Sequence, residues 1–267
     1  MSRNGPLALA FNALFVTFML APLAVVVAVS LTPTGYLEFP PSGLSLRWFR
    51  AILDNPDFIA AFWTSLYLGI ASATLATLVA VPAGLAIGRY RFAGRGALVG
   101  LFMSPLTVPS IVLGISFLRF LTTIGLSGTF VGLVACHAII VMPYVLRLVL
   151  AAVVGLDRDA EKAAVSLGAS SFTAFRRVTL PMILPGVAGG WVLAFITSFD
   201  EVTVTVFIVN PSTLTLPVRL FAHITQTTDP LVASISTMII LFTVLLLFLL
   251  ERFYGLERLL VGGGGRE

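Results

Sequence analysis

Two adjacent carboxylates, Asp200 and Glu201, interrupt the apolar stretch "ITSFDEVTVTVF" and could attract a charged ligand. A charged side chain inside a membrane span costs about 2.5 to 3.5 kcal/mol on insertion scales and is functional by default. If the stretch is helical, Thr197, Glu201 and Thr205 share one face by their i, i+4, i+8 spacing, and Asp200 lies on the adjacent sector. Such an acidic, hydroxyl-bearing face suits a cationic amine. The alternative is structural: the acids pair with an arginine or accept hydrogen bonds from another helix.

A second polar candidate is the stretch "MSPLTVPSIVLG", in which Pro105 and Pro109 lie close together. Each proline removes a backbone N–H and clashes with the preceding helical turn. Irregular backbone is tolerated inside a membrane where it faces protein or a water-filled cavity. Thr107 and Ser110 are therefore candidates for lining a solute pathway, with an ordinary proline kink in a packed helix as the alternative.

Hydrolytic chemistry has one weak signal, the sequence "GLSG" from Gly125 to Gly128, which matches the G-x-S-G of rhomboid-type proteases. A serine nucleophile needs a base within hydrogen-bond reach. His137 lies about ten residues further along, roughly 15 Å away in a helix, and nothing places His223 beside Ser127. We therefore expect no catalytic residues, and we expect His137 to make an interhelical hydrogen bond.

The composition shows what kind of scaffold positions these residues. Of the 267 residues, 58% are hydrophobic and 10% are charged, with a mean hydropathy of +1.04. A soluble domain carries about 25% charged residues, so this chain must use the lipid bilayer as solvent. Two histidines and the single Cys136 leave little material for a metal site and allow no internal disulfide.

Helices that cross a membrane need about 20 mainly apolar residues. Six segments qualify, and we expect an all-α polytopic protein in which residues 1–267 form one transmembrane domain. The first segment exceeds the apolar run of a signal peptide, so we expect a retained anchor. The second is rich in small residues and should pack inside a bundle. The spans cover about 7–31, 63–88, 97–120, 129–150, 182–209 and 231–250.

The basic residues give the orientation, because Lys and Arg concentrate on the cytoplasmic side of membrane proteins. With the N-terminus inside, 12 of the 16 basic residues fall in cytoplasmic segments, which places both termini in the cytoplasm. The net charge of +4 therefore reflects membrane topology, and we expect no nucleic-acid partner. The twelve are Arg3, Arg89, Arg91, Arg95, Arg147, Arg158, Lys162, Arg176, Arg177, Arg252, Arg258 and Arg266.

The cytoplasmic segment of about 151–181 carries a short helical pattern in "EKAAVSLGASSFTAFRRVTLPMILPG". One nearly all-methyl face is flanked by charge, which suits close docking on another protein; the alternative is a loop helix folded back on its own bundle. Gly168 fits the C′ position that ends the helix, and Ser170 or Ser171 can cap a second one. Leu180-Pro181 and Pro185-Gly186 should break the chain before the fifth span. The methyl face consists of Ala160, Ala163, Ala164 and Leu167.

This stretch resembles the signature loop of ABC importer permeases: Glu-Ala-Ala, three residues, Gly, nine residues, Ile, one residue, Leu-Pro. Ala163-Ala164, Gly168, Val178 and Leu180-Pro181 match in spacing. Lys162 departs from the pattern because it stands where the family has Glu, and Glu161 is one position earlier. "RYRFAGRG" and "WVLAFITSFDEVTVTVFI" extend the similarity to the subfamily that imports polyamines and related solutes.

The resemblance implies a subunit of an importer in the bacterial inner membrane that works by alternating access. It implies three kinds of partner: a homologous permease subunit, ATP-binding subunits and an extracytoplasmic solute-binding protein. Residues 160–164, Leu167, Gly168 and Ser170 would dock on the ATPase. The chain has a single lysine, preceded by Glu161, and so lacks G-x-x-x-x-G-K-[ST]; ATP and Mg²⁺ would be bound by the partner. The alternative is a self-sufficient secondary transporter or channel, which needs no ATPase dock.

Overall fold

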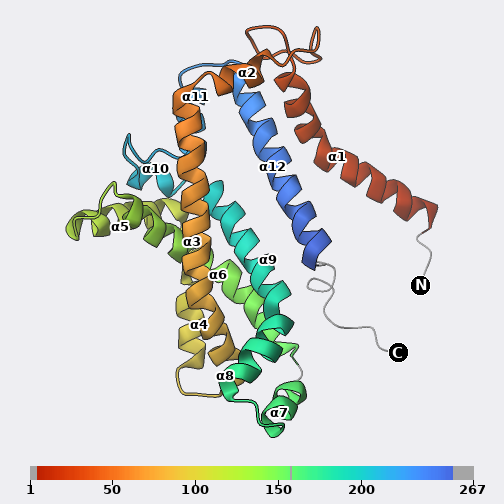
Figure 1. The fold of residues 1–267 in the computed structure, drawn as a ribbon. Coiled ribbons are helices and arrows are strands. Elements are labelled where there is room, and N and C mark those ends of the chain that lie inside the picture. The colour runs from red at the N-terminus through yellow and green to blue at the C-terminus, as the bar shows by residue number, and fades with distance from the viewer. Residues whose placement is uncertain (1–4, 157, 255–267) are drawn as a thin grey trace. The chain divides into compact units, whose positions relative to one another are not determined.

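The computed structural model describes residues 5–156 and 158–254, and every regular element in these ranges is a helix (Figure 1). Five helices in this part of the chain are long and apolar enough to cross a membrane, and a sixth is added if a bent pair counts as one span. The expected all-α polytopic fold is therefore confirmed. Arg3, Asp157, Arg258 and Arg266 lie outside the described residues.

The chain divides into two compact units, and the smaller one, unit 1, comprises residues 1–60 and 219–243. It contains α1 (Pro6–Ser30), α2 (Arg47–Leu53), the start of α3 (Pro56–Arg89), most of α11 (Leu216–Ile224) and the first half of α12 (Leu231–Tyr254). The Ser234 hydroxyl donates to the Ser30 carbonyl at 3.1 Å, which ties α12 to the end of α1. Most of α1 is exposed, as expected of a span that faces lipid or another subunit.

Unit 2 comprises residues 61–218 and 244–267 and contains the elements that position both candidate sites. Its centre is α6 (Phe130–Val154), which packs along α9 (Leu180–Phe199). The approach is close enough that a Cβ on Gly186 would lie 2.6 Å from the Ala152 Cβ. A Cβ on Gly84 of α3 would likewise lie 2.6 Å from Val149 of α6. The expected packing of the small-residue second span inside a bundle is therefore confirmed.

The expected single span over 97–120 is instead two helices that meet at 100°. α4 (Arg95–Met103) continues into the short 3-10 helix η1 (Ser104–Leu106), and α5 (Ser110–Thr123) begins after a break. Pro105 and Pro109 explain the break, because neither nitrogen can donate a helical hydrogen bond. The two prolines thus break the helix completely.

The chain is continuous where two breaks were expected before the fifth span. α8 (Ser171–Ala174), the π-helical turn η2 (Phe175–Thr179) and α9 form one helix of 29 residues. Pro181 falls in the first turn of α9, and the π-helical turn precedes it. The helix continues through both prolines, because Pro185 also lies inside α9. The expectations of breaks at Leu180-Pro181 and at Pro185-Gly186 were therefore wrong.

Candidate functional site

The loop that is predicted to be cytoplasmic folds as the short helix α7 (Asp159–Ser166), with termination signals that the sequence predicted. Gly168 adopts φ +91°, a left-handed conformation that favours glycine. Its N–H donates to the Val165 carbonyl at 2.9 Å, and the Ala169 N–H donates to the Ala164 carbonyl at 3.1 Å. These two bonds form a Schellman motif. The Ser170 hydroxyl then caps α8 by accepting from the Thr173 N–H at 3.2 Å.

Glu161 anchors α7 to the rest of unit 2. Its carboxylate lies 2.8 Å from the guanidinium of Arg89, at the end of α3, and accepts from the Thr179 hydroxyl at 2.9 Å. Arg89 also donates to the Thr179 hydroxyl at 3.1 Å, which closes a triangle between three elements. Arg158 extends the network by donating to the Arg89 carbonyl at 2.9 Å.

The electrostatics of this anchor favour the ionised acid. Burial of the Glu161 carboxyl opposes its ionisation. The hydrogen bonds from Thr179 and Arg89, together with the charges of Arg89 and Arg158, outweigh burial and lower the pKa of Glu161 from its ordinary value of 4.5. The sequence gave no sign of this partnership, because Arg89 lies 72 residues from Glu161.

The predicted docking residues of α7 do not all point the same way. Glu161 and Ala164 are half-buried, and Glu161 faces Arg89 and Thr179 as described. The others are exposed, and they include the Leu167 side chain at 89% of its maximal exposure. The exposed ones are Ala160, Lys162, Ala163, Leu167, Gly168 and Ser170. A docking partner would therefore contact Lys162, whereas Glu161 faces the other way, toward Arg89 and Thr179.

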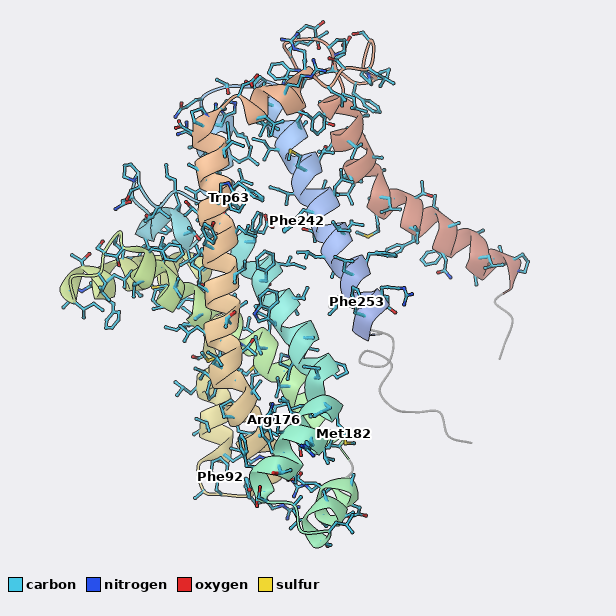
Figure 2. All side chains as sticks on the ribbon, viewed as in Figure 1. Trp63, Phe92, Arg176, Met182, Phe242 and Phe253 are labelled. Carbon is cyan, nitrogen blue, oxygen red and sulfur yellow. The ribbon has the colours of Figure 1, made fainter. Side chains whose placement is uncertain are left out.

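An open cleft of about 390 Å³ lies between α7 and the end of α3. Arg89, Arg158 and Lys162 contribute three cationic groups to its lining, and Glu161 contributes the carboxylate. Figure 2 places Arg176 and Phe92 at this same end of unit 2, and Trp63 at the other. This end of the unit is thus basic, in keeping with the expected cytoplasmic side.

The second candidate site lies at the end of α9. The helix ends at Phe199, so Glu201 and Thr205 do not continue the helical face of Thr197 that the sequence predicted. The Glu201 carboxylate instead accepts from the Val204 N–H at 2.8 Å, in front of α10 (Thr205–Ile208). This bond holds the Glu201 side chain against the turn that leads into α10. The exposed Asp200 follows α9 directly and is the more accessible acid.

A buried histidine holds the segment that carries the two acids. His137 of α6 is fully buried and lies 2.8 Å from the Ser198 hydroxyl and 3.1 Å from the Thr205 hydroxyl. Because the Thr205 hydroxyl donates to the Glu201 carbonyl at 2.8 Å, it must accept from the imidazole Nε2–H. Nδ1 then accepts from Ser198. The expected interhelical role of His137 is confirmed, and the bond to Thr205 fixes the chain after the break.

The break between η1 and α5 carries the remaining two predicted residues, Thr107 and Ser110, and both are exposed. The Thr107 hydroxyl donates to the Ser104 carbonyl at 2.8 Å, and Ser110 is the first residue of α5. α5 packs against α10, and a Cβ on Gly114 would lie 2.5 Å from the ring of Phe207. The two helix breaks therefore belong to neighbouring elements.

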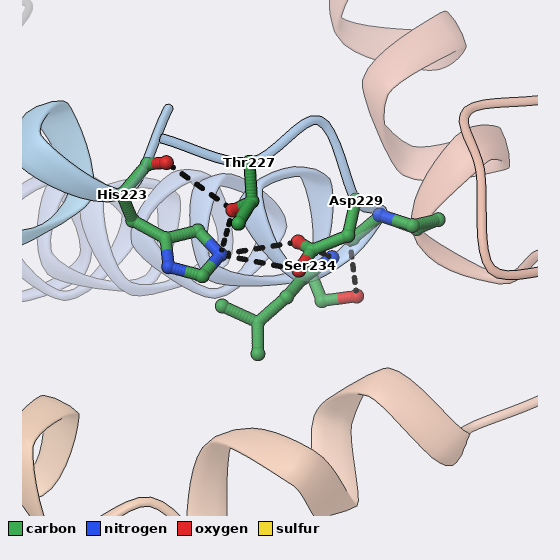
Figure 3. A network of polar contacts seen from close by, with 6 residues as sticks. His223, Thr227, Asp229 and Ser234 are labelled. Atoms are coloured by element: carbon green, nitrogen blue, oxygen red, sulfur yellow. Dashed lines mark hydrogen bonds and ion pairs between the residues drawn. The ribbon is translucent and has the colours of Figure 1, made fainter. Parts of the chain in front are cut away.

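The other histidine has a role within unit 1. His223 of α11 lies 3.2 Å from the Asp229 carboxylate and 2.9 Å from the Thr227 hydroxyl (Figure 3). Asp229 also accepts from the Leu231 N–H at 3.2 Å, at the start of α12. This network joins α11 to α12. Both histidines thus have partners other than Ser127, the nucleophile of the hydrolase hypothesis.

Comparison with known proteins finds relatives over most of the chain. The family model for the binding-protein-dependent transport system inner membrane component matches residues 80–256. The spermidine/putrescine transport system permease protein PotC of Haemophilus influenzae is 31% identical over 240 residues, covering 90% of this chain and 93% of the relative. The putrescine transport system permease protein PotI of Escherichia coli is 28% identical, covering 84% and 82%.

Solved structures show the same fold. A bacterial ABC transporter involved in the import of the acidic polysaccharide alginate superimposes with a TM-score of 0.73 at 16% identity. The match covers 93% of this chain and 95% of that one.

Proposed function

The chain belongs to the family of binding-protein-dependent transport system inner membrane components, and from this premise we propose that it forms part of the path for a small cationic amine. It is a multi-pass permease subunit of an ABC importer. A homologous permease subunit completes the path, and ATP-binding subunits with bound ATP and Mg²⁺ drive it. An extracytoplasmic binding protein delivers the solute. Both termini lie in the cytoplasm.

One observation carries the proposal that an ATPase drives this chain: α7 is fixed on one side and exposed on the other. The Glu161 carboxylate joins α7 to Arg89 of α3 and to Thr179 of the helix that continues into α9. A force applied to the exposed side of α7 by an ATPase therefore reaches two membrane-spanning helices directly. Closure of the ATPases would turn the bundle from inward-open to outward-open by this route.

The substrate class rests on the acids at the end of α9 and on the names of the relatives. The relatives are named for spermidine and putrescine, which are cationic amines at neutral pH. Asp200 is an exposed carboxylate at a helix break, where irregular backbone is tolerated beside a water-filled path. Thr107 and Ser110 lie at the neighbouring break and offer hydroxyl groups to the same path.

The test is uptake of labelled spermidine or putrescine into proteoliposomes that contain the full complex with its binding protein. We expect uptake to require ATP. Asp200→Asn keeps the side-chain volume and should reduce uptake about tenfold, the equivalent of about 1.4 kcal/mol, with normal assembly. Glu201→Gln is the matched control, because its amide oxygen can still accept from Val204.

The outcomes separate a pathway from a structural role. A structural acid that pairs inside the protein would make assembly fail when it is neutralised, because the stranded partner costs about 3 to 5 kcal/mol. If Asp200→Asn assembles and transports at the wild-type rate, the acidic path is wrong. If wild-type uptake proceeds without any ATP-binding subunit, the importer assignment of the partners is wrong.

A further inference from the structure

The exposed side of α7 has a lysine at its centre. Asp159, Lys162, Ala163 and Ser166 recur at i, i+3, i+4 and i+7 and are all exposed. Glu161 points the other way, into its contacts with Arg89 and Thr179. Figure 1 shows α7 at the end of unit 2, beyond α8. Any partner that covers this side of α7 must therefore cover the Lys162 ammonium group.

The region of unit 2 that contains α7 has more basic than acidic residues. Within residues 58–199 the described acids are Asp159 and Glu161, and the sequence adds Asp157, which lies outside the described residues. Glu161 is engaged by Arg89 and Thr179. The same region exposes several arginines, and the cleft beside α7 is lined by Arg158 together with Lys162. The exposed arginines are Arg91, Arg95, Arg119, Arg147, Arg158, Arg176 and Arg177.

The contact that Lys162 makes within α7 is one that a partner can replace. Its ammonium group lies 2.8 Å from the Asp159 carboxylate, at i, i+3 spacing, and the two side chains are 73% and 80% exposed. Ion pairs this exposed contribute little to stability and exchange readily. Burying Lys162 under a partner would be costly unless the partner supplied a compensating charge.

We propose that the ATP-binding subunit places a carboxylate against Lys162, next to Arg158, when it docks on α7. The inference rests on the proposed function of α7 as the ATPase dock. The signature that this loop resembles has Glu at the position of Lys162, so the charge of this chain is reversed there. A groove that accepts α7 must carry the opposite charge to match. The carboxylate would make docking selective for the ATPase of this importer.

The experiment uses the fact that Lys162 is the only lysine of the chain. The tagged full-length chain is purified from its native membranes and treated with a water-soluble carbodiimide, which joins an amine to a carboxylate in direct contact. We expect an amide bond between Lys162 and an Asp or Glu of a protein that contains a G-x-x-x-x-G-K-[ST] sequence. Asp159→Asn removes the competing carboxylate within α7 and should increase the yield of this cross-link.

Two variants separate charge from reactivity. Lys162→Arg keeps the charge but cannot be coupled, so the ATP-binding subunit should co-purify as in the wild type, without a cross-link. Lys162→Gln removes the charge, and we expect co-purification to fall at least about fivefold at low ionic strength, a difference that added salt should diminish. The amount of chain in the membrane should be the same in all variants.

Each failure has a distinct meaning. If Lys162→Gln retains the ATP-binding subunit as well as the wild type does, the proposal is overturned while docking on α7 stands. A cross-link from Lys162 only to its own chain or to an anionic lipid also overturns it. If no ATP-binding subunit co-purifies with the wild type, the proposed function fails first, and the inference fails with it.

Discussion

Neutralising Glu161 should release α7 from unit 2 without unfolding the bundle. The Arg89 and Glu161 side chains are 14% and 24% exposed, so the free energy that their ion pair contributes should lie between the values for exposed and buried pairs. An exposed pair contributes up to about 1 kcal/mol, and breaking a buried pair costs about 3 to 5 kcal/mol. We expect Glu161→Gln to lower the free energy of opening of α7 by about 2 kcal/mol, which corresponds to a roughly 30-fold larger open population.

Amide hydrogen exchange on the purified chain measures this opening locally. The amides of α7 in Glu161→Gln should exchange about 30-fold faster, and the buried amides of α6 should not change. Lys162→Gln is the control, because it breaks an exposed pair and should change exchange by no more than about fivefold. A double-mutant cycle with Arg89→Met should give a coupling of about 1 to 2 kcal/mol.

The pH dependence has a definite sign. Because the pKa of Glu161 is lowered in the folded chain, its contribution is complete above the ordinary value of 4.5 and is lost as the pH falls through the lowered pKa. Opening of α7 should therefore be independent of Glu161 titration near pH 7.

In the double-mutant cycle, additive effects of Glu161→Gln and Arg89→Met, with no coupling, would refute the anchoring of α7 by this ion pair.

Three further predictions concern orientation, packing and the buried histidine. In intact cells that express the chain without Cys136, an impermeant thiol reagent should label Ser212→Cys but not Ser170→Cys. The reverse pattern would contradict the topology. Gly186→Ala should lower the free energy of unfolding by about 1 to 3 kcal/mol through overpacking against α6, whereas Gly100→Ala, which meets nothing within 4 Å, should not; equal thermal midpoints would disprove the close approach. His137→Phe should cost about 1 to 3 kcal/mol because two hydroxyl partners lose their bonds, and an unchanged thermal midpoint would disprove that role.

Local signals in the sequence were sufficient for the elements of the loop around α7. Gly168 ends α7 because a left-handed residue at C′ is a property of the chain itself, and Ser170 caps α8 through a bond to a residue three positions away. The lengths of the apolar segments predicted the membrane spans, because hydropathy is also a property of the chain itself. The orientation that the basic residues indicate stays a prediction.

The prolines show where local rules were not enough. Pro105 and Pro109 ended a helix, whereas Pro181 lies within a continuous one. A π turn, Phe175–Thr179, precedes Pro181, but Pro22, Pro82 and Pro143 lie inside continuous helices without one. Nothing in the spacing of the prolines distinguishes the two cases.

By itself, therefore, the sequence determined the membrane class, the all-helical fold and the loop motif, because these depend on hydropathy and on contacts between near neighbours. Only the tertiary structure decided which way the site residues face. Glu161 turns inward because Arg89 and Thr179 come from other helices, and this leaves Lys162 outside. The segment after Asp200 is held by the bond from the Val204 N–H to Glu201 and by the contact of His137 with Thr205, residues 68 positions apart. Periodicity carries no information about partners at such separations.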